Sequence, residues 1–471
     1  MKYKSIIFLI TILFIVASFA SSMNVKYDFS TNEIIRFYKS NHPPIYINDN
    51  DDFTQENGVT EGNGTKENPY IIENWIIEGD GSDGNGIFIN GTNAYFIIRN
   101  CTVSGFYGET GSSWGTGVRL VTVENGRIED TTTYMNYLDI RIEDNSKYIK
   151  IDNCSSYNYS KYLTKGINCR SSSNINISYY ECFNKDEGIF LYDVSFVLIE
   201  KSKFYNNTGN GISLYGENIK HITLKDCKIY HNKWYGIYAE VEKFWAHSAY
   251  IHIANCEIFN NALPEPQEIR KAEGIFIWNL HDNIIENCSI YHNGFGIYIE
   301  SRGNIIRNCS IFNHSHGMNP VSVGVHFVFG RGLLGDEKKS NTLLNCDVYN
   351  NEIGIWLEIG KAIIYKNNVF NNGYFGIRVY AFSNGKVTYN NIYDNGYLTN
   401  YTIGVEVTQF SFANLRHNYW GVEDGPSLYL LDCDYNRYLL RDGGGDNIYF
   451  KRSLPFMRPW STELIQDAGV K

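Results

Sequence analysis

A repeat of about 22 residues limits what this chain can fold into. The stretch GIFIWNLHDNIIENCSIYHN, which begins at Gly274, is followed by GIYIESRGNIIRNCSIFNHS, which begins at Gly296, so the step is 296 − 274 = 22 residues. Both stretches read Gly-Ile-aromatic-Ile and then Asn-Ile-Ile-x-Asn-Cys-Ser-Ile-aromatic. A unit this short cannot bury its own apolar face, so it must stack on copies of itself.

A Gly-Ile or Gly-Val pair marks the successive copies. It occurs at Gly86, Gly117, Gly166, Gly188, Gly211, Gly236, Gly274, Gly296, Gly324, Gly354, Gly376 and Gly404, and one further copy, LDIRIEDNSKYIKIDNC, lacks the glycine. Short runs in each copy alternate apolar residues with others, which is typical of strands with one buried face. A step of about 22 residues is too short for a strand, a helix and a return strand. The sequence therefore predicts an all-β, right-handed parallel β-helix, a solenoid of about 13 coils with capped ends.

The two ends of the chain depart from the repeat. Lys2 and Lys4 precede a mostly apolar run, which predicts a signal peptide over residues 1–20, with a retained N-terminal anchor as the alternative. We expect residues 21–42 to form a linker or a short cap helix. Residues 43–460 are then a single β-helix domain that includes a closing coil at 417–460, and 461–471 are a C-terminal tail.

Charge and hydropathy limit the classes of partner and the cellular locations that we expect for this chain. The formal net charge is −10, and it becomes −12 once Lys2 and Lys4 are removed. An acidic surface repels a phosphate backbone, so we expect no nucleic acid partner. No second apolar run is long enough to span a membrane, so we expect a mature chain without a transmembrane span. The predicted location is secreted or at the cell surface, or the periplasm if the organism has one.

Cysteine and asparagine also recur once per copy. Eight of the ten cysteines read as one slot of the repeat: Cys101, Cys154, Cys182, Cys227, Cys256, Cys288, Cys309 and Cys346. Such a slot predicts an inward column of free, buried thiols rather than disulfides. Asparagines recur at a similar slot: Asn100, Asn153, Asn255, Asn287, Asn308, Asn345, Asn367, Asn390 and Asn418. We expect a structural ladder of amides at left-handed turns.

The strand after each repeat glycine carries two outward positions, the two x positions of Gly-Ile-x-Ile-x. Over the later coils these positions hold Tyr238, Phe276, Tyr298, His326, Trp356 and Arg378 in the first column and Glu240, Trp278, Glu300 and Glu358 in the second. These ten residues are the candidate groove. Two insertions, NALPEPQEIRKAE and GRGLLGDEKKS, are expected to form its walls. Rows of rings and carboxylates suit an extended glycan, and the alternative is a ladder of rings that stabilises the sheet by stacking.

Two stretches outside the repeat point to a family. GVTEGNGTKENPYIIENWII opens the coil region at Gly58, and HNYWGVEDGPS closes it at His417. Together with the Gly-Ile and Asn-Cys repeats, they resemble the NosD-like right-handed parallel β-helix proteins, a group that overlaps the carbohydrate-binding and sugar-hydrolase β-helix domains. The resemblance covers about residues 43–460 and implies the fold. It implies no single activity, because this scaffold hosts lyases, hydrolases, epimerases, adhesins and a copper-site maturation factor.

The copper chemistry that the resemblance implies finds few ligands in the sequence. Only five methionines occur, and His314 and His316 form the one close histidine pair. We expect that pair to lie in a solvated turn, which makes the two histidines weak candidates for a metal site. No catalytic residue is assigned, because the aspartate series of pectin hydrolases and the Asp-Pro-His tetrad of alginate epimerases are missing.

These observations favour a secreted β-helix that binds an extracellular glycan or serves as a cell-surface interaction module. The alternatives are a polysaccharide lyase or glycoside hydrolase, and a periplasmic copper-binding NosD-like protein. Product release from glycans and copper retention after dialysis distinguish the three. Trp420, in the closing coil, is expected to cover the apolar end of the rod, with a sugar platform as the alternative role.

Overall fold

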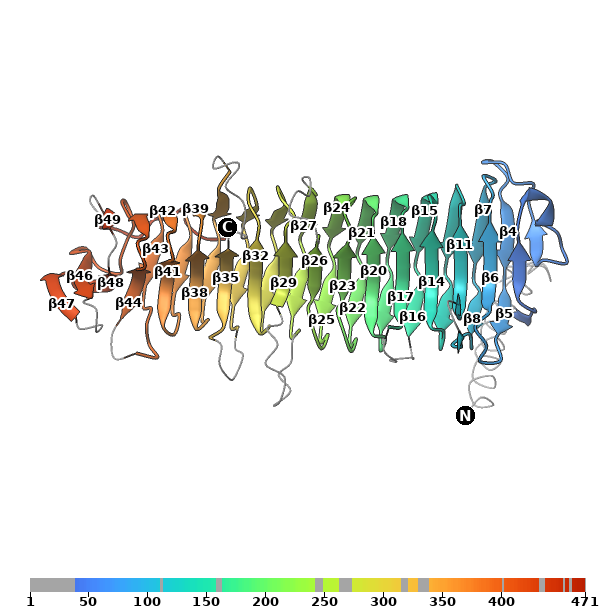
Figure 1. Ribbon diagram of the computed structural model, residues 1–471, viewed down its shortest axis with the longest axis horizontal. Coiled ribbons are helices and arrows are strands. Elements are labelled where there is room, and N and C mark those ends of the chain that lie inside the picture. The colour runs from blue at the N-terminus through green and yellow to red at the C-terminus, as the bar shows by residue number, and fades with distance from the viewer. Residues whose placement is uncertain are drawn as a thin grey trace, which may run out of the picture.

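Three sheets, here named A, B and C, run side by side along a rod (Figure 1). The computed structural model describes residues 39–110, 113–157, 163–241, 249–261, 273–314, 321–328, 339–399, 402–431, 437–451, 454–456 and 460–470. Within these residues there is no α-helix and one 3-10 turn, η1 (Asn50–Asp52). Each coil passes through sheets B, C and A in that order, and the neighbouring coils pair in parallel. The predicted all-β parallel solenoid is confirmed.

Sheet B carries the repeat glycines. Its strands are β2 (Ile45–Ile47), β6 (Asn85–Asn90), β11 (Thr116–Val121), β14 (Leu138–Glu143), β17 (Lys165–Arg170), β20 (Glu187–Tyr192), β23 (Ile212–Tyr215), β26 (Ile237–Glu240), β29 (Glu273–Trp278), β32 (Phe295–Glu300), β35 (Val323–Val328), β38 (Ile353–Glu358), β41 (Phe375–Tyr380), β44 (Ile403–Val407), β46 (Pro426–Leu431), β47 (Arg437–Arg441) and β48 (Gly445–Phe450). The strands from β6 to β44 correspond to the predicted coils.

Sheet C follows sheet B in each coil and has 16 strands. They are β3 (Val59–Glu61), β4 (Tyr70–Glu73), β7 (Phe96–Arg99), β12 (Gly126–Glu129), β15 (Lys147–Asp152), β18 (Ser173–Ser178), β21 (Ser195–Glu200), β24 (Lys220–Lys225), β27 (Ile251–Ala254), β30 (Ile284–Glu286), β33 (Ile305–Arg307), β36 (Asn341–Leu344), β39 (Lys361–Tyr365), β42 (Asn384–Thr388), β45 (Phe412–Asn414) and β49 (Leu454–Phe456).

Sheet A completes each coil and has 14 strands. They are β1 (Ser40–Asn41), β5 (Trp75–Glu78), β8 (Thr102–Ser104), β13 (Thr132–Tyr134), β16 (Ser155–Tyr157), β19 (Glu181–Phe183), β22 (Lys203–Tyr205), β25 (Lys228–Tyr230), β28 (Glu257–Phe259), β31 (Ser289–Tyr291), β34 (Ser310–Phe312), β37 (Asp347–Tyr349), β40 (Asn368–Phe370) and β43 (Asn391–Tyr393). A separate antiparallel hairpin joins β9 (Glu109–Thr110) and β10 (Ser113–Trp114).

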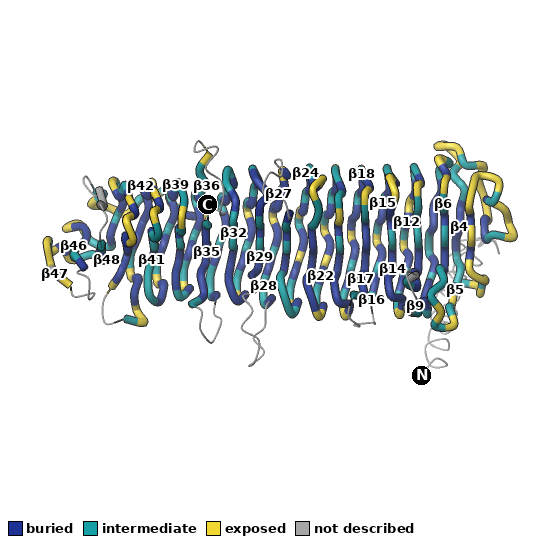
Figure 2. The backbone as a smooth tube through the Cα atoms, in the orientation of Figure 1, coloured by how far each residue is buried: buried dark blue, intermediate teal, exposed yellow. Residues whose placement is uncertain are grey.

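Inward isoleucines, valines and leucines from all three sheets form one continuous core. Figure 2 shows buried residues in every coil along the rod, with the exposed residues gathered at turns and at the ends. The repeat glycine is explained by close packing between coils. A Cβ at Gly236 would lie 2.6 Å from the carbonyl oxygen of Gly274, and one at Gly211 would lie 2.7 Å from that of Gly236. Any larger residue would therefore push neighbouring coils apart.

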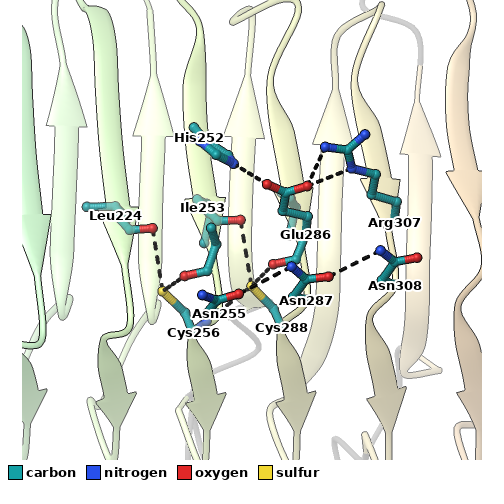
Figure 3. A network of polar contacts seen from close by, with 12 residues as sticks. Leu224, His252, Ile253, Asn255, Cys256, Glu286, Asn287, Cys288, Arg307 and Asn308 are labelled. Carbon is teal, nitrogen blue, oxygen red and sulfur yellow. Dashed lines mark hydrogen bonds and ion pairs between the residues drawn. The ribbon is translucent and has the colours of Figure 1, made fainter. Parts of the chain in front are cut away.

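The cysteine column is present, with one residue misplaced by the sequence reading. The nine described cysteines are free and buried, and the thiol of Cys256 lies 3.3 Å from the carbonyl oxygen of Ala254. Figure 3 shows Cys256 and Cys288 on successive coils. The prediction was wrong for Cys182, which sits in the middle of β19, where it pairs with Ser156. Tyr180 occupies the slot that was expected for Cys182. The backbone N–H of the next residue, Glu181, donates to the carbonyl of Cys154, which holds the same slot in the preceding coil.

We expect the described thiols to be unreactive until the chain unfolds. Burial raises the pKa of Cys101 to about 11 and that of Cys169 to about 12, so the reactive thiolate is scarce in the folded protein. Titration with a thiol reagent at pH 8 should find these nine cysteines protected under native conditions and accessible in denaturant. Rapid native labelling of Cys101 or Cys169, identified by peptide mapping, would contradict the burial described above.

The predicted asparagine slot resolves into two slots that differ by one residue. Asn100, Asn153, Asn255, Asn287, Asn308 and Asn345 have positive φ at the turn before sheet A. The Asn308 amide donates to Asn287 at 3.2 Å, and Asn287 donates to Asn255 at 3.3 Å (Figure 3). The buried cysteine slot is instead occupied by the three later residues, Asn367, Asn390 and Asn418. The backbone N–H of Cys346 donates to the side chain of Asn367, which holds this slot in the next coil. The amide ladder is confirmed, and the single slot is corrected.

A second, fully buried ladder follows the strands of sheet A. Its members are Asn207, Asn232, Asn261, Asn293, His314, Asn351, Asn372, Asn395 and Asp446, and each backbone N–H donates to the side chain of the next residue. The solvated turn expected for His314 is therefore wrong, since its side chain takes an asparagine's place in this ladder. Burial lowers the pKa of His314 to about 3. His316 lies outside the described residues.

The two ends of the rod differ from the middle coils. Residues 1–38, which include the predicted signal peptide and most of the linker or cap helix, lie outside the described residues. At the other end, β48 pairs with β44 and with β46, and β47 closes the sheet in the antiparallel sense. The segment expected as a C-terminal tail runs back along sheet A, where Asn391 exchanges two hydrogen bonds with the backbone of Ile465.

Candidate binding surface on sheet B

The strand register brings all ten residues of the candidate groove onto one face. Tyr238 pairs with Phe276, which pairs with Tyr298, and the column continues through His326 and Trp356 to Arg378. The second column runs from Glu240 through Trp278, Glu300 and Val328 to Glu358. Both columns follow from the period-two alternation of strands whose other residues point into the core.

The rings of the first column stack on one another along the rod. The Tyr238 and Phe276 centroids are 4.9 Å apart and those of Phe276 and Tyr298 are 5.2 Å apart, with 9° between the planes in both pairs. His326 stacks on Trp356 at 4.6 Å. Parallel rings at this spacing cover each other's faces, so this column presents ring edges and hydroxyl groups outward.

Hydrogen bonds tie the first column to the carboxylates of the second. The hydroxyl of Tyr238 donates to Glu240, and that of Tyr298 donates to Glu300 at 2.9 Å. Burial and the neighbouring Glu300 carboxylate raise the pKa of Tyr298 well above its usual value. These tyrosines therefore stay protonated and act as fixed donors that orient the carboxylates.

Trp278 differs from the other rings of the surface. It lies in the second column between Glu240 and Glu300, and its side chain is partly exposed. It makes no ring-to-ring contact with any described residue. Its indole faces are therefore the ones on this surface that no neighbouring ring covers.

Side-chain contacts hold the residues at the far end of the candidate groove in place. His326 is 3% exposed and lies 3.1 Å from Glu358. Arg378 stacks over Trp356 at 5.0 Å and bonds to Glu406 at 2.6 Å. Trp356, Glu358 and Arg378 stay partly exposed, and the buried His326 separates them from the partly exposed residues between β26 and β32. Most of the two insertions expected as walls, residues 262–272 and 329–338, lies outside the described residues.

The sequence reading missed a longer aromatic ladder on sheet A. Eleven rings from successive coils stack with centroids 4.8–5.6 Å apart and planes 1–11° apart: Tyr134, Tyr157, Phe183, Tyr205, Tyr230, Phe259, Tyr291, Phe312, Tyr349, Phe370 and Tyr393. The signal was the aromatic residue that ends Cys-Ser-Ile-aromatic. Because neighbours cover the ring faces, this ladder stabilises the stack of coils.

An open hollow of about 530 Å³ lies elsewhere, at the turn before sheet A. It is lined by Asn255, Asn287, Cys288, Ser289, Asn308, Ser310, Asn345 and Val470. Its amides already bond to one another along the ladder in Figure 3. The hollow is separate from the candidate groove, which lies on sheet B.

The described residues do not fit a copper ion. Among them, no three histidine, cysteine, aspartate or glutamate side chains lie together as a metal site requires. The buried thiol of Cys256 already donates to backbone carbonyls, and the Nδ1 atom of His314 accepts from Asn293. A soft copper site needs several such ligands converging on one point.

Two protein-family models match the chain in succession. The model described as a right handed beta helix region matches residues 85–244, and the model described as the periplasmic copper-binding protein NosD matches residues 244–425. The two matches together extend over residues 85–425 and are consistent with a NosD-like right-handed β-helix family. No curated protein sequence matches the chain. In its described part, no helix is long and apolar enough to cross a membrane.

Solved structures with a similar architecture come from several kinds of protein. The A-module of the Azotobacter vinelandii mannuronan C-5 epimerase AlgE6 is 12% identical, with a TM-score of 0.40, and the match covers 82% of this chain and 89% of that chain. The Dettilon tailspike protein is 13% identical, with a TM-score of 0.42 and coverage of 71% and 62%. Pectate lyase Pel9A is 12% identical, with a TM-score of 0.35 and coverage of 70% and 76%. At these identities the likeness concerns the fold alone.

Proposed function

We propose that this β-helix acts outside the cytoplasm as a carbohydrate-binding or cell-surface interaction module, and that it binds an extended glycan on sheet B between β26 and β32. The single observation that carries the proposal is Trp278, a partly exposed indole between two carboxylates that tyrosine hydroxyls orient. An indole face packs on the apolar face of a sugar ring. The carboxylates of Glu240 and Glu300 accept hydrogen bonds from its hydroxyl groups.

The arrangement favours binding over cleavage. Glu240 and Glu300 lie two rungs apart, or about 10 Å, whereas inverting glycosidases separate their carboxyl groups by roughly 6.5–9.5 Å. His326, the one imidazole in the candidate groove, is 3% exposed and beyond the reach of a substrate. His326 therefore supplies no general base to a bound sugar.

Removing the indole is the direct test of this surface. We expect Trp278→Ala to lower the affinity for the best ligand of a glycan array at least tenfold, about 1.4 kcal/mol, because the exposed indole supplies the apolar contact. Glu300→Gln should weaken the same ligand less, since an amide still accepts one hydrogen bond. Isothermal titration calorimetry with each variant measures both effects.

Phe196→Ala is the matched control, because Phe196 is an exposed ring, 56% accessible, on β21 in sheet C. It should leave glycan binding unchanged. Equal binding by the parent and Trp278→Ala would refute the proposed surface. Release of shortened or unsaturated products during the assay would favour the enzymatic alternative, and copper retained after dialysis would favour the metal-binding one.

A further inference from the structure

Three arginines occupy consecutive coils on the same face of sheet B, ahead of the candidate groove. Arg119 on β11 pairs with Arg141 on β14, in the column that continues through Asn168, Phe190 and Ser213 to Tyr238. Arg170 on β17 lies in the neighbouring column, which continues through Tyr192 and Tyr215 to Glu240. The candidate groove and the arginines therefore share two unbroken columns.

Two of the three arginines, Arg119 and Arg141, share one carboxylate. Glu143, which is buried, accepts from the Nε atom of Arg119 at 2.7 Å and lies 2.5 Å from a terminal nitrogen of Arg141. The neighbouring ion pair of Lys165 with Glu187 adds no net charge. The cluster of Arg119, Arg141, Arg170 and Glu143 thus carries a charge of 3 − 1 = +2 on a chain whose formal net charge is −10.

Two of the guanidinium groups have unused donors. The Nε atom of Arg141 is buried and makes no hydrogen bond among the described residues. Arg170 bonds to the amide oxygen of Asn168 at 3.2 Å and stacks over the rings of Phe190 and Tyr192, and no described carboxylate pairs with it. Burial lowers the pKa of Arg141, and the charges of Arg119 and Arg170 lower it further. An anion placed on the partly exposed guanidinium groups would relieve this repulsion.

We propose that this arginine cluster is an anion-binding site that takes the carboxylate or sulfate groups of an acidic glycan lying along the two columns. The part of this proposal that concerns the glycan rests on the proposed function. The anion site itself is inferred from the guanidinium groups alone. Five coil steps separate Arg141 from Phe276, the ring beside Trp278, so one ligand must extend over about 24 Å to contact both. The acidic group should therefore add affinity only in oligomers long enough to span that distance.

The test compares one neutral glycan with its carboxylated and sulfated derivatives on the same backbone. The parent should bind an acidic derivative at least tenfold more tightly than the neutral glycan, and this preference should shrink as salt is added. Arg141→Gln should remove the preference and leave binding of the neutral glycan unchanged. Arg127→Gln is the matched control, because Arg127 lies in the coil that holds Arg119 but on β12 of sheet C, where it pairs with Glu129.

Melting temperatures measured with inorganic sulfate test the anion site independently of glycan binding. Sulfate should raise the melting temperature of the parent and of Arg127→Gln but not that of Arg141→Gln. If Arg141→Gln does not fold, Arg170→Gln replaces it. Sulfate protection without binding of any glycan would keep the anion site and refute the glycan function. Equal affinity for acidic and neutral glycans, together with no effect of sulfate, would overturn the anion site.

Discussion

Replacing Trp420 with alanine should lower the free energy of unfolding by about 3–5 kcal/mol, the range for deleting a core tryptophan. Trp420 is fully buried and belongs to the core. It follows Tyr419, which pairs with Asn391, so its side chain is the last inward member of sheet A. A Cβ at Gly404 would lie 3.3 Å from the indole. Truncation would leave a large cavity at the end of the rod, where no further coil can fill it.

Denaturant unfolding followed by circular dichroism measures this loss, and Trp278→Ala is the control because that indole lies on the outer face. The variant should also associate end to end, since a loosened end exposes apolar residues and unpaired strand edges. Sedimentation velocity detects such association. A Trp420→Ala protein that unfolds like the parent and remains monodisperse would show that Trp420 is no cap. The sugar-platform alternative would then be favoured.

The second large effect concerns Asp446, which ends the buried amide ladder. It is 4% exposed and accepts both the backbone and the side-chain N–H of Asn395, at 3.0 and 2.9 Å. Burial raises its pKa from 3.8 to about 7. A raised pKa means that the folded protein binds the proton more tightly than the unfolded chain does. Stability from this group is therefore complete below about pH 4 and is lost as the pH rises through 7.

Asp446→Asn removes that titration while keeping a side-chain oxygen that accepts from Asn395. The shift of about 3 units corresponds to about 4 kcal/mol at 1.36 kcal/mol per unit. We therefore expect the stability of the variant relative to the parent to increase by about 4 kcal/mol between pH 4 and pH 8. Any constant cost of the new amide cancels in this comparison. Urea unfolding at several pH values measures the difference, and a difference that does not change with pH would contradict the raised pKa.

Much of this architecture could be read from spacing. The two outward columns of sheet B were predicted residue by residue, because strand alternation has a period of two and equal coils keep their register. The same logic placed most cysteines in one inward column. The Gly-Ile pair identifies each coil because only glycine fits where neighbouring coils lie too close together for a Cβ atom.

Spacing also explains the errors. Tyr180 and Cys182 both face inward, since residues two apart lie on the same face of a strand, so a shift of two positions leaves the pattern unchanged. His314 follows Asn293 by 21 residues, as Asn304 follows Asn283, and both steps join neighbours in buried ladders. Its residue type suggested a solvated turn, whereas its spacing placed it in the core.

The sequence by itself determined the solenoid, its coil count and which side chains share a face, because these depend only on local periodicity and on each coil needing its neighbours. The tertiary structure alone decided what those faces offer to a ligand. Ring faces are covered or free according to how side chains of adjacent coils turn toward each other, which leaves the indole of Trp278 uncovered. Likewise, that Arg119 and Arg141 share the carboxylate of Glu143 depends on distances across coils, which the order of residues along the chain does not contain.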